Sequence, residues 1–425
     1  RFRIDVRVRQ EVTAINPTEK TVTVHALESE NVYTETYDKL LLAPGAKPTV
    51  PALSGTSSER VFTLRTVEDT LRIRRFAEDQ KPKTAVLAGG GFIGLEMAEN
   101  LVEMGVSVTI IQRPKQLLAP LDGDMASFVH AEMRRHGVAL RLGETVTEFR
   151  QDVDSVLTLL EESEPLHSDM VLLAIGVTPD THLAKDAGLR LGIRGSIAVN
   201  ERMETSVPDI YAVGDAVEVT HFVTDQKALI SLAGPANKQG RIAADNICGG
   251  SSHFHGSQGS SVLKLFGLTV ASTGINEKAA QAAGIAYDKV VLFPASHTTY
   301  YPGAQSMTMK VLYEKESLRL LGAQIVGGDS VDKRIDVLAT AIRAKMTALE
   351  LTELDLSYAP PYSSAKDPVN MAGFIIEDLV SGKVRQFHWN DVEGLPRDGS
   401  ITLLDVRTEG EYRRGHLNGF RNIPL

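Results

Sequence analysis

Hydrophobic and polar positions alternate along the first fifty residues in a way that is typical of β-strands. Apolar side chains recur at every second position in residues 4–8 (Ile-Asp-Val-Arg-Val) and again in residues 21–25 (Thr-Val-Thr-Val-His). This period of two predicts half-buried strands, and the Asn-Pro-Thr-Glu-Lys segment at 16–20 predicts a turn between them. Residues 39–42 form a short apolar run that predicts a buried strand. The chain is therefore expected to begin with a β-meander.

The pattern changes between residues 84 and 141. It becomes strand, glycine-rich turn, helix, strand, helix and strand. Strands that alternate with helices are typical of a βαβ unit with a parallel sheet.

Two matching strand-to-loop exits flank this unit. Residues 40–48 end in Ala-Pro-Gly-Ala-Lys-Pro and residues 171–179 end in Ala-Ile-Gly-Val-Thr-Pro, so both follow the pattern A-x-G-x-x-P. The repeat predicts that one domain is interrupted by another, although two unrelated turns would give the same letters.

Further boundaries follow from loop-like composition. Residues 251–261 are rich in Gly, Ser and His, and the two histidines there have no acidic neighbours, so we interpret them as part of a solvated loop and predict no metal site. A mixed α+β segment is expected from 262 to about 382. A second boundary near 387–399 leads into a short αβ segment at 401–425.

Composition excludes several classes of protein. A length of 425 residues suggests about three domains. The net charge of −9 gives no general attraction for nucleic acid or anionic lipid. The longest apolar runs, such as 170–177, are far shorter than the roughly 20 residues that span a membrane. The single cysteine, Cys248, excludes an internal disulfide framework, and with no targeting segment in view it favours a cytoplasmic location.

A dinucleotide-binding loop follows the strand that starts near residue 85. Gly89, Gly91 and Gly94 form G-x-G-x-x-G between this strand and an amphipathic helix, and a second strand follows at 106–111. The first glycine permits the tight turn, the second admits the pyrophosphate and the third allows close helix–strand packing. The helix N-terminus would hold the pyrophosphate, so we assign these glycines, Phe92 and Ile93 to the cofactor.

The end of the second strand favours NADPH over NADH. An NAD site usually has Asp or Glu there, whereas this chain has Gln112 and Arg113, with Lys115 close by. A guanidinium suits a 2′-phosphate, although Arg113 and Lys115 could also be solvated loop residues.

Residues 205–216 introduce a second dinucleotide. They resemble the T-x-x-x-x-Y-A-x-G-D flavin motif of the pyridine nucleotide–disulfide oxidoreductases, in which the aspartate, here Asp215, hydrogen-bonds the ribitol of FAD. The resemblance also assigns Gly176, Gly214 and Ala216 to FAD.

Three further segments resemble one branch of that family. Tyr300-Tyr301-Pro302, residues 331–337 (Val-Asp-Lys-Arg-Ile-Asp-Val) and residues 357–368 (Ser-Tyr-Ala-Pro-Pro-Tyr-Ser-Ser-Ala-Lys-Asp-Pro) resemble the coenzyme A–disulfide reductases and the NAD(P)H persulfide and polysulfide reductases. Residues 403–416 resemble the opening of a rhodanese domain.

The resemblance implies an α/β fold with two Rossmann-like dinucleotide-binding domains, in which an NAD(P) domain interrupts the FAD domain. An α+β dimerisation domain and the start of a rhodanese domain would follow. The expected limits are 1–50 and 173–258 for the FAD domain, 51–172 for the NAD(P)H domain, 259–385 for the dimerisation domain and 390–425 for the rhodanese segment.

The family chemistry passes hydride from nicotinamide to FAD and then electrons to a cysteine that attacks a disulfide or persulfide. By resemblance, Phe92 covers the nicotinamide pocket and Glu96 lies near the flavin. Core packing for Phe92 and a helix-surface position for Glu96 are the simpler alternatives.

The coenzyme A branch also implies substrate residues. Tyr300 and Tyr358 would replace the His-Glu acid–base pair of other disulfide reductases, with Tyr358 also contacting the flavin. Asn237 and Lys366 would contact coenzyme A. Tyr358 and Lys366 would come from the partner subunit, so the active site would be shared in a homodimer. Alternatively, the tyrosines are ordinary interface or core residues.

The first FAD glycine motif and the nucleophilic cysteine are expected before residue 1, so the sequence is interpreted as a fragment cut at both ends and inactive by itself. Cys248 closes a predicted helix and is interpreted as structural. An NADH oxidase or peroxidase of the same fold and a non-catalytic nucleotide-binding module remain as alternatives.

Overall fold

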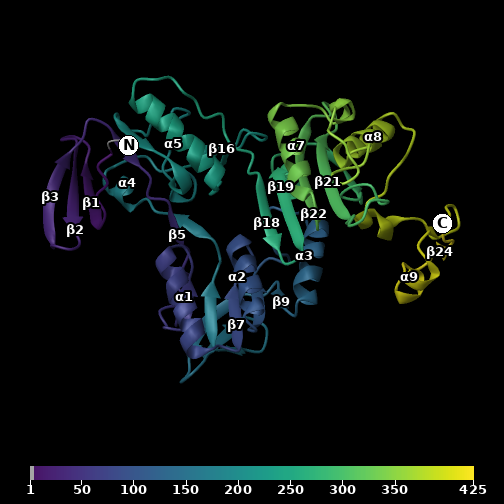
Figure 1. Ribbon diagram of the computed structural model, residues 1–425, viewed down its shortest axis with the longest axis horizontal. Helices are drawn as coiled ribbons and strands as arrows, with labels where there is room; N and C mark the ends of the chain where they lie inside the picture. Colours follow the sequence, from purple (N-terminus) through teal and green to yellow (C-terminus); the bar gives the residue numbers. More distant parts are fainter. Residues whose placement is uncertain (1–3) are drawn as a thin grey trace. The chain divides into compact units, whose positions relative to one another are not determined.

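The computed structural model describes residues 4–425 (Figure 1). The chain divides into two compact units, Arg1–Phe374 and Ile375–Leu425, which are described separately.

The strand expected at residues 4–8 is not formed, and residues 1–3 lie outside the described part. Ile4, Val6 and Val8 are each more than 70% exposed. Alternation predicts a strand only where a neighbouring strand supplies hydrogen bonds and a core covers one face. The first strand is therefore β1 (Gln10–Asn16).

The expected meander follows. β1, β2 (Thr21–Ala26) and β3 (Asn31–Thr36) form an antiparallel sheet. The predicted turn is confirmed, since the Asn16 side chain accepts hydrogen bonds from the backbone N–H groups of Thr18 and Glu19.

The βαβ prediction is also confirmed. A five-stranded parallel sheet has the order β6-β13-β7-β8-β9. Its strands are β6 (Val61–Thr63), β7 (Thr84–Ala88), β8 (Ser107–Gln112), β9 (Ala139–Leu142) and β13 (Met170–Leu173). The helices of this region are α1 (Val67–Gln80), α2 (Phe92–Glu103) and α3 (Gly123–Arg135).

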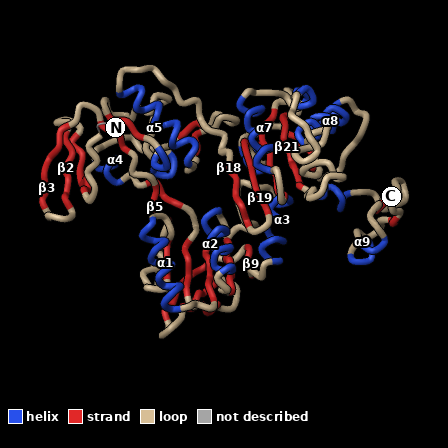
Figure 2. Tube along the Cα trace, in the orientation of Figure 1, coloured by secondary structure: helices blue, strands red, loops and turns tan. Residues whose placement is uncertain are grey.

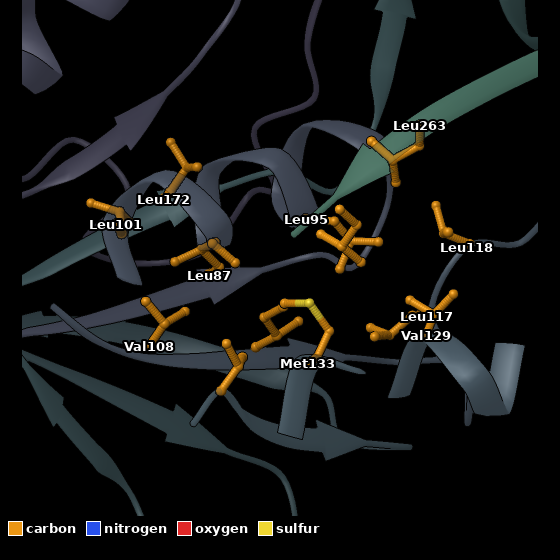
Figure 3. Close-up of a cluster of buried hydrophobic side chains, with 14 of the residues drawn as sticks. Leu87, Leu95, Leu101, Val108, Leu117, Leu118, Val129, Met133, Leu172 and Leu263 are labelled. Carbon is orange, nitrogen blue, oxygen red and sulfur yellow. The ribbon is translucent and has the colours of Figure 1, made fainter. Parts of the chain in front are cut away.

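Buried aliphatic side chains join these elements. Leu87 of β7, Leu95 of α2 and Leu172 of β13 belong to one hydrophobic cluster and are each 0% exposed (Figure 3). Their packing fixes where α2 begins relative to the end of β7, and thus the shape of the glycine loop between them. A separate antiparallel sheet contains β10 (Val146–Gln151), β11 (Val156–Leu160) and β12 (Leu166–Ser168).

The interruption of one domain by another is visible in the strand pairing. β4 (Leu40–Leu42) pairs in parallel with β15 (Ile210–Ala212), which lies beyond the whole inserted sheet in the sequence. β5 (Ala46–Pro48) pairs antiparallel with β14 (Val177–Pro179), so the two A-x-G-x-x-P exits lie side by side.

These two exits bond to each other through equivalent positions. The Thr49 N–H donates to the carbonyl of Gly176, and the Asp180 N–H donates to the carbonyl of Gly45, both at 3.0 Å. The sequence repeat is therefore a matched pair of crossings between domains, and not two unrelated turns.

The second part of the interrupted domain contains short elements around a buried cluster that includes Ile197, Ala212, Ala216 and Ala243. The elements are α4 (His182–Asp186), β16 (Val219–Thr220), β17 (Lys227–Ala228) and α5 (Ala233–Ile247).

The predicted α+β segment is a five-stranded antiparallel sheet, ordered β18-β19-β22-β21-β20, with α7 packed on β19 and β22 (Figure 2). The strands are β18 (Ser261–Leu265), β19 (Leu268–Gly274), β20 (Tyr287–Leu292), β21 (Met307–Glu314) and β22 (Leu320–Gly327). The helices are α6 (Glu277–Ala282), α7 (Val331–Arg343) and α8 (Pro368–Val380).

The C-terminal unit confirms the expected αβ segment. β23 (Leu404–Asp405) and β24 (Arg421–Asn422) pair in parallel around α9 (Glu409–Arg414). Among residues 4–425, no helix is both long enough and apolar enough to cross a bilayer.

Candidate functional site

The three glycines after β7 meet three different steric demands. Gly89 has φ of +113°, and a Cβ there would lie 2.2 Å from the carbonyl oxygen of Ala174. A Cβ on Gly94 would lie 2.1 Å from the carbonyl oxygen of Gly89, whereas a Cβ on Gly91 would meet no described atom within 4 Å. The first and third glycines therefore permit the turn and the close packing, and the second faces open space at the start of α2. This geometry fits a dinucleotide pyrophosphate.

The side chain of Gln112 bonds to the backbone of this glycine loop. Its Oε1 accepts a hydrogen bond of 2.9 Å from the backbone N–H of Gly90. Arg113 and Lys115 are exposed, and neither has a hydrogen bond or ion pair to any other residue in 4–425. The two cations are therefore available to an anion, while Gln112 already has an internal partner.

Phe92, Ile93 and Glu96 occupy the first turns of α2. Phe92 is half-buried against the cluster of Figure 3, and Ile93 is half-buried as well. Partial burial, and secondarily the charge of Glu99, raises the pKa of Glu96 above its usual value. The roles of Phe92 over the nicotinamide pocket and of Glu96 near the flavin stay predictions. The packing of Phe92 also agrees with the simpler alternative, in which Phe92 is a core residue.

Asp215 lies in a short 3₁₀ turn, Gly214–Ala216, after β15. The Gly214 N–H donates to Oε1 of Gln239 in α5 at 2.7 Å, and Asp215 accepts from Arg65 at 3.0 Å. The Asp215 side chain is only 15% exposed, and Ala216 is fully buried. Gln239 therefore holds the backbone of the turn, and Arg65 orients the carboxylate of Asp215.

Sequence reasoning missed Arg65 and Gln239. Both contacts are tertiary, and Arg65 lies far from Asp215 in the chain. The only local signal was the capping box of Thr66 and Asp69, which starts α1 and so fixes the backbone beside Arg65. Gly176, by contrast, lies in the second exit with φ of +111°, where glycine is the natural residue.

The two predicted catalytic tyrosines come together. The hydroxyl groups of Tyr300 and Tyr358 are 3.0 Å apart although 58 positions separate them. Tyr300 is 74% exposed and Tyr358 is 45% exposed. The hydrogen bond between the two hydroxyls raises the pKa of Tyr358 above its usual value. Because both belong to one chain, the subunit that supplies Tyr358 also supplies Tyr300.

The predicted substrate residues are placed separately. Asn237 is exposed near the start of α5, and Lys366 is exposed on the loop that carries Tyr358. Within residues 4–425, no hydrogen bond links either side chain to the tyrosine pair. The structure therefore groups Tyr300, Tyr358 and Lys366 on one domain and Asn237 on another.

Cys248 is exposed at the C-cap of α5, as the predicted helix end requires. Gln239, which contacts the Asp215 turn, lies nine positions earlier on the same helix, and a rise of 1.5 Å per residue separates the two by about 14 Å. Cys248 is therefore remote from the Asp215 turn, and its structural role stays a prediction.

Three carboxylates, on Asp122, Asp124 and Glu277, offer oxygens within 4.8 Å of one another. The fully buried ammonium of Lys310 lies among them, at 3.0 Å from Asp122 and 2.8 Å from Asp124, with a further bond to Glu277. The cluster is an internal ion network, and sequence reasoning did not foresee it.

With this geometry in view, comparison with known proteins defines the class. Residues 1–240 match the pyridine nucleotide-disulphide oxidoreductases, and residues 261–368 match the dimerisation domain of the same family. The chain belongs to the pyridine nucleotide-disulphide oxidoreductase family, whose members use FAD and NAD(P)H. It is an FAD-dependent NAD(P)H oxidoreductase.

Three relatives show where the chain lies within the family. It is 34% identical to coenzyme A disulfide reductase of Staphylococcus haemolyticus over 88% of this chain and 84% of that protein. The crystal structure of reduced Bacillus anthracis CoADR-RHD has a TM-score of 0.95 and 46% identity, covering 100% of this chain and 76% of that one. A NAD-dependent persulfide reductase from A. fulgidus has a TM-score of 0.91 and 37% identity, covering 98% and 75%.

Proposed function

We propose that the protein uses NAD(P)H to reduce coenzyme A disulfide, or a coenzyme A persulfide or polysulfide, and acts as a homodimer. The disulfide would give two coenzyme A thiols, and the persulfide one thiol and hydrogen sulfide, each at the expense of one NAD(P)H and one proton. The observation that carries the proposal is the hydroxyl contact between Tyr300 and Tyr358 on the dimerisation domain. The named activities of the three relatives support the same substrate class.

The residues that would hold the two cofactors come from the inserted parallel-sheet domain and from the domain that it interrupts. When bound, NAD(P)H and FAD supply hydride transfer and onward electrons. The loop of Gly89, Gly91 and Gly94 would bind the nicotinamide dinucleotide, with Phe92 and Ile93 beside it. We propose that Arg113 binds the 2′-phosphate, so that NADPH is preferred.

Asp215 would bind the ribitol of FAD through the carboxylate oxygen that Arg65 leaves free. Gly176, Gly214 and Ala216 would shape the backbone around it, and Glu96 would lie at the flavin edge.

The tyrosine pair would stabilise the departing thiolate. A phenol hydroxyl can donate a hydrogen bond to sulfur and accept one from a second hydroxyl, so one tyrosine can orient the other. Tyr358 is protonated at neutral pH, since even the ordinary pKa of a tyrosine lies well above 7 and that of Tyr358 is raised further, so the pair holds protons to donate. Lys366 would attract a phosphate of coenzyme A, and Asn237 would contact the same substrate from the other subunit.

The sequence-based domain limits stand as part of this proposal, including a rhodanese segment at 390–425. The low cysteine content supports a cytoplasmic location, where free thiols and persulfides are maintained.

An anaerobic NADPH titration of the full-length protein, followed by visible absorbance, tests the proposal. We expect the flavin to bleach and then to reoxidise when coenzyme A disulfide or persulfide is added. Reoxidation by oxygen or peroxide alone would assign the protein to the oxidase and peroxidase group instead. If the purified full-length protein bound no flavin, the role proposed for Asp215 would be wrong.

A further inference from the structure

We propose that Arg334 is the positioning residue that holds the hydroxyls of Tyr300 and Tyr358 in contact, by clamping the two loops that carry them. The catalytic consequence rests on the function proposed above, whereas the clamp itself is a statement about geometry.

The guanidinium of Arg334 is the centre of a buried network. Arg334 lies in α7 and is 0% exposed. Its Nη1 donates to the carbonyl of Ser330 at 3.2 Å, within the same segment. Its Nη2 lies within hydrogen-bond distance of four acceptors, which are the Ser296 carbonyl (3.0 Å), the Tyr362 carbonyl (3.3 Å), Ser363 Oγ (3.0 Å) and Asp367 Oδ2 (3.0 Å).

These acceptors belong to both tyrosine loops. Ser296 is at the base of the loop that carries Tyr300, where its N–H donates to the Gln305 carbonyl at 2.7 Å and closes the loop. Tyr362, Ser363 and Asp367 follow Tyr358. One nitrogen atom therefore bonds to both segments at once.

The two loops also bond to each other directly, beside the Arg334 network. The N–H of Thr298 donates to the Ser363 carbonyl at 3.1 Å, and its hydroxyl donates to the Pro360 carbonyl at 3.2 Å. Thr298 is two positions from Tyr300, and Pro360 is two positions from Tyr358. Any shift of one loop relative to the other would therefore separate the tyrosine hydroxyls.

The tyrosines have little packing of their own to hold them. Both side chains are exposed, while Ser296 and Ser363 beneath them are fully buried. Their mutual position is thus set by the buried backbone and not by contacts around the rings.

The energetics also indicate a geometric role. Nε of Arg334 is buried and has no hydrogen-bond partner within residues 4–425, and a buried donor without a partner is unfavourable for stability. An apolar side chain would often serve stability as well or better at a buried site. The planar guanidinium fixes Nη2 between the loops because Nη1 is held by the Ser330 carbonyl, whereas a lysine ammonium is a single point that cannot make both sets of contacts.

The test uses the full-length holoenzyme with Arg334→Lys, which keeps the charge but loses the second nitrogen of the guanidinium. Flavin reduction by NADPH should keep its wild-type rate in anaerobic stopped flow. Reoxidation by coenzyme A disulfide should slow by about 100-fold with little change in KM, because small misplacement of reacting groups has costs of this size. In a Tyr300→Phe/Tyr358→Phe background, Arg334→Lys should cause no further loss of the reoxidation rate. The double variant has already removed the hydroxyl contact that Arg334 maintains.

Arg343→Lys is the matched control. Arg343 ends the same helix but donates to the carbonyls of His255 and Gly256, away from both tyrosine loops. It should leave both half-reactions unchanged.

A second measurement tests the clamp without turnover. In ¹³Cζ-tyrosine NMR of the holoenzyme, Arg334→Lys should lower the pKa of Tyr358 as Tyr300→Phe does, because both changes remove the hydroxyl contact. Ser363→Ala should cause a smaller shift in the same direction, since it removes the hydroxyl that bonds to Arg334 and Asp367 but leaves the other bonds of Arg334 in place.

The outcomes separate the clamp from the proposed function. If Tyr300→Phe/Tyr358→Phe turns over normally while Arg334→Lys still lowers the pKa of Tyr358, the clamp stands and the catalytic role of the pair is wrong. If Arg334→Lys leaves that pKa unchanged, or its loss multiplies with that of the double variant, the clamp is overturned. If Arg334→Lys does not fold with FAD, Ser363→Ala decides the matter, and an unchanged Tyr358 pKa in that variant is the contrary result.

Discussion

Two buried cations in the dimerisation domain illustrate different uses of internal charge. Lys310 of β21 and Arg334 of α7 are both 0% exposed. Lys310 is surrounded by three carboxylates, with Lys289 also bonded to one of them. Arg334 has one carboxylate, Asp367, and otherwise bonds to carbonyl and hydroxyl oxygens.

The difference follows from which parts of the chain each cation connects. The carboxylates around Lys310 come from the start of α3 and the start of α6, so this cluster joins the nucleotide-binding region to the antiparallel sheet. A compact ammonium is adequate for that purpose, because attraction between charges has little directional requirement. Most acceptors around Arg334 lie on two loops, and Nη2, held in place by the planar guanidinium, bonds to both of them. We infer that the first cluster serves stability and the second serves position.

The largest contrast should come from removing one carboxylate from each cluster. Asp367→Asn leaves the Arg334 guanidinium buried without a counter-charge, and this should cost about 3–5 kcal/mol of unfolding free energy. Asp124→Asn leaves Lys310 with Asp122 and Glu277, and the effect should stay within about 1 kcal/mol. Urea unfolding of both variants measures the contrast, and equal losses would show that the two clusters are equivalent.

The Lys310 cluster should also determine acid stability. Burial opposes the ionisation of Glu277, but hydrogen bonds from Lys289 and Lys310 outweigh it and lower its pKa to about 2. A depressed carboxyl pKa contributes stability that is complete above the unfolded pKa of 4.5 and is lost as pH falls towards 2. This contribution is at most about 3 kcal/mol.

Glu277→Gln should therefore flatten the fall of the melting temperature between pH 5 and pH 3. Glu316→Gln is a suitable control, because the Glu316 side chain is exposed and has no hydrogen bond or ion pair within residues 4–425. A pH profile identical to that of the wild type would remove Glu277 from the acid response.

A smaller effect is expected at the tyrosines, where the Arg334 network acts on function. Tyr300→Phe removes the hydroxyl partner of Tyr358 without a cavity, because the ring is 74% exposed. Reoxidation by coenzyme A disulfide should slow by about tenfold to 100-fold, whereas flavin reduction and the melting temperature should not change. Loss of both half-reactions together would indicate a structural role for the pair.

The smallest effect is expected at an exposed cation. Arg113 has no internal partner in residues 4–425, unlike the two buried cations. Arg113→Ala should lower kcat/KM for NADPH by about tenfold, the value of one charged hydrogen bond, and leave NADH unaffected. Arg75→Ala, at an exposed position of α1, is the control. Equal losses with both nucleotides would show that Arg113 does not contact the 2′-phosphate.

Much of the fold could be predicted from local pattern. The glycine loop, the β7–α2–β8 unit and the turn at Asn16 follow from residues that are close together in the chain. The strand expected at residues 4–8 was wrong because alternation does not supply a pairing partner. The repeated A-x-G-x-x-P exits predicted the interruption of one domain, and the pairing of β5 with β14 confirmed it.

The candidate site divides in the same way. Asp215 and the tyrosines could be selected from motifs, but Arg65, Gln239 and the acceptors of Arg334 could not. Each of these contacts joins segments that are distant in sequence, and nothing local indicates which buried carbonyl a guanidinium will meet.

The sequence by itself determined the class of this protein, because glycines at forced turns and a Gly-Asp turn after a strand are local requirements of dinucleotide binding. Only the tertiary structure decided which charges are buried and what they hold together. Burial makes a charge dependent on all of its neighbours at once, and those neighbours are set by the packing of α3, α6, α7 and β21.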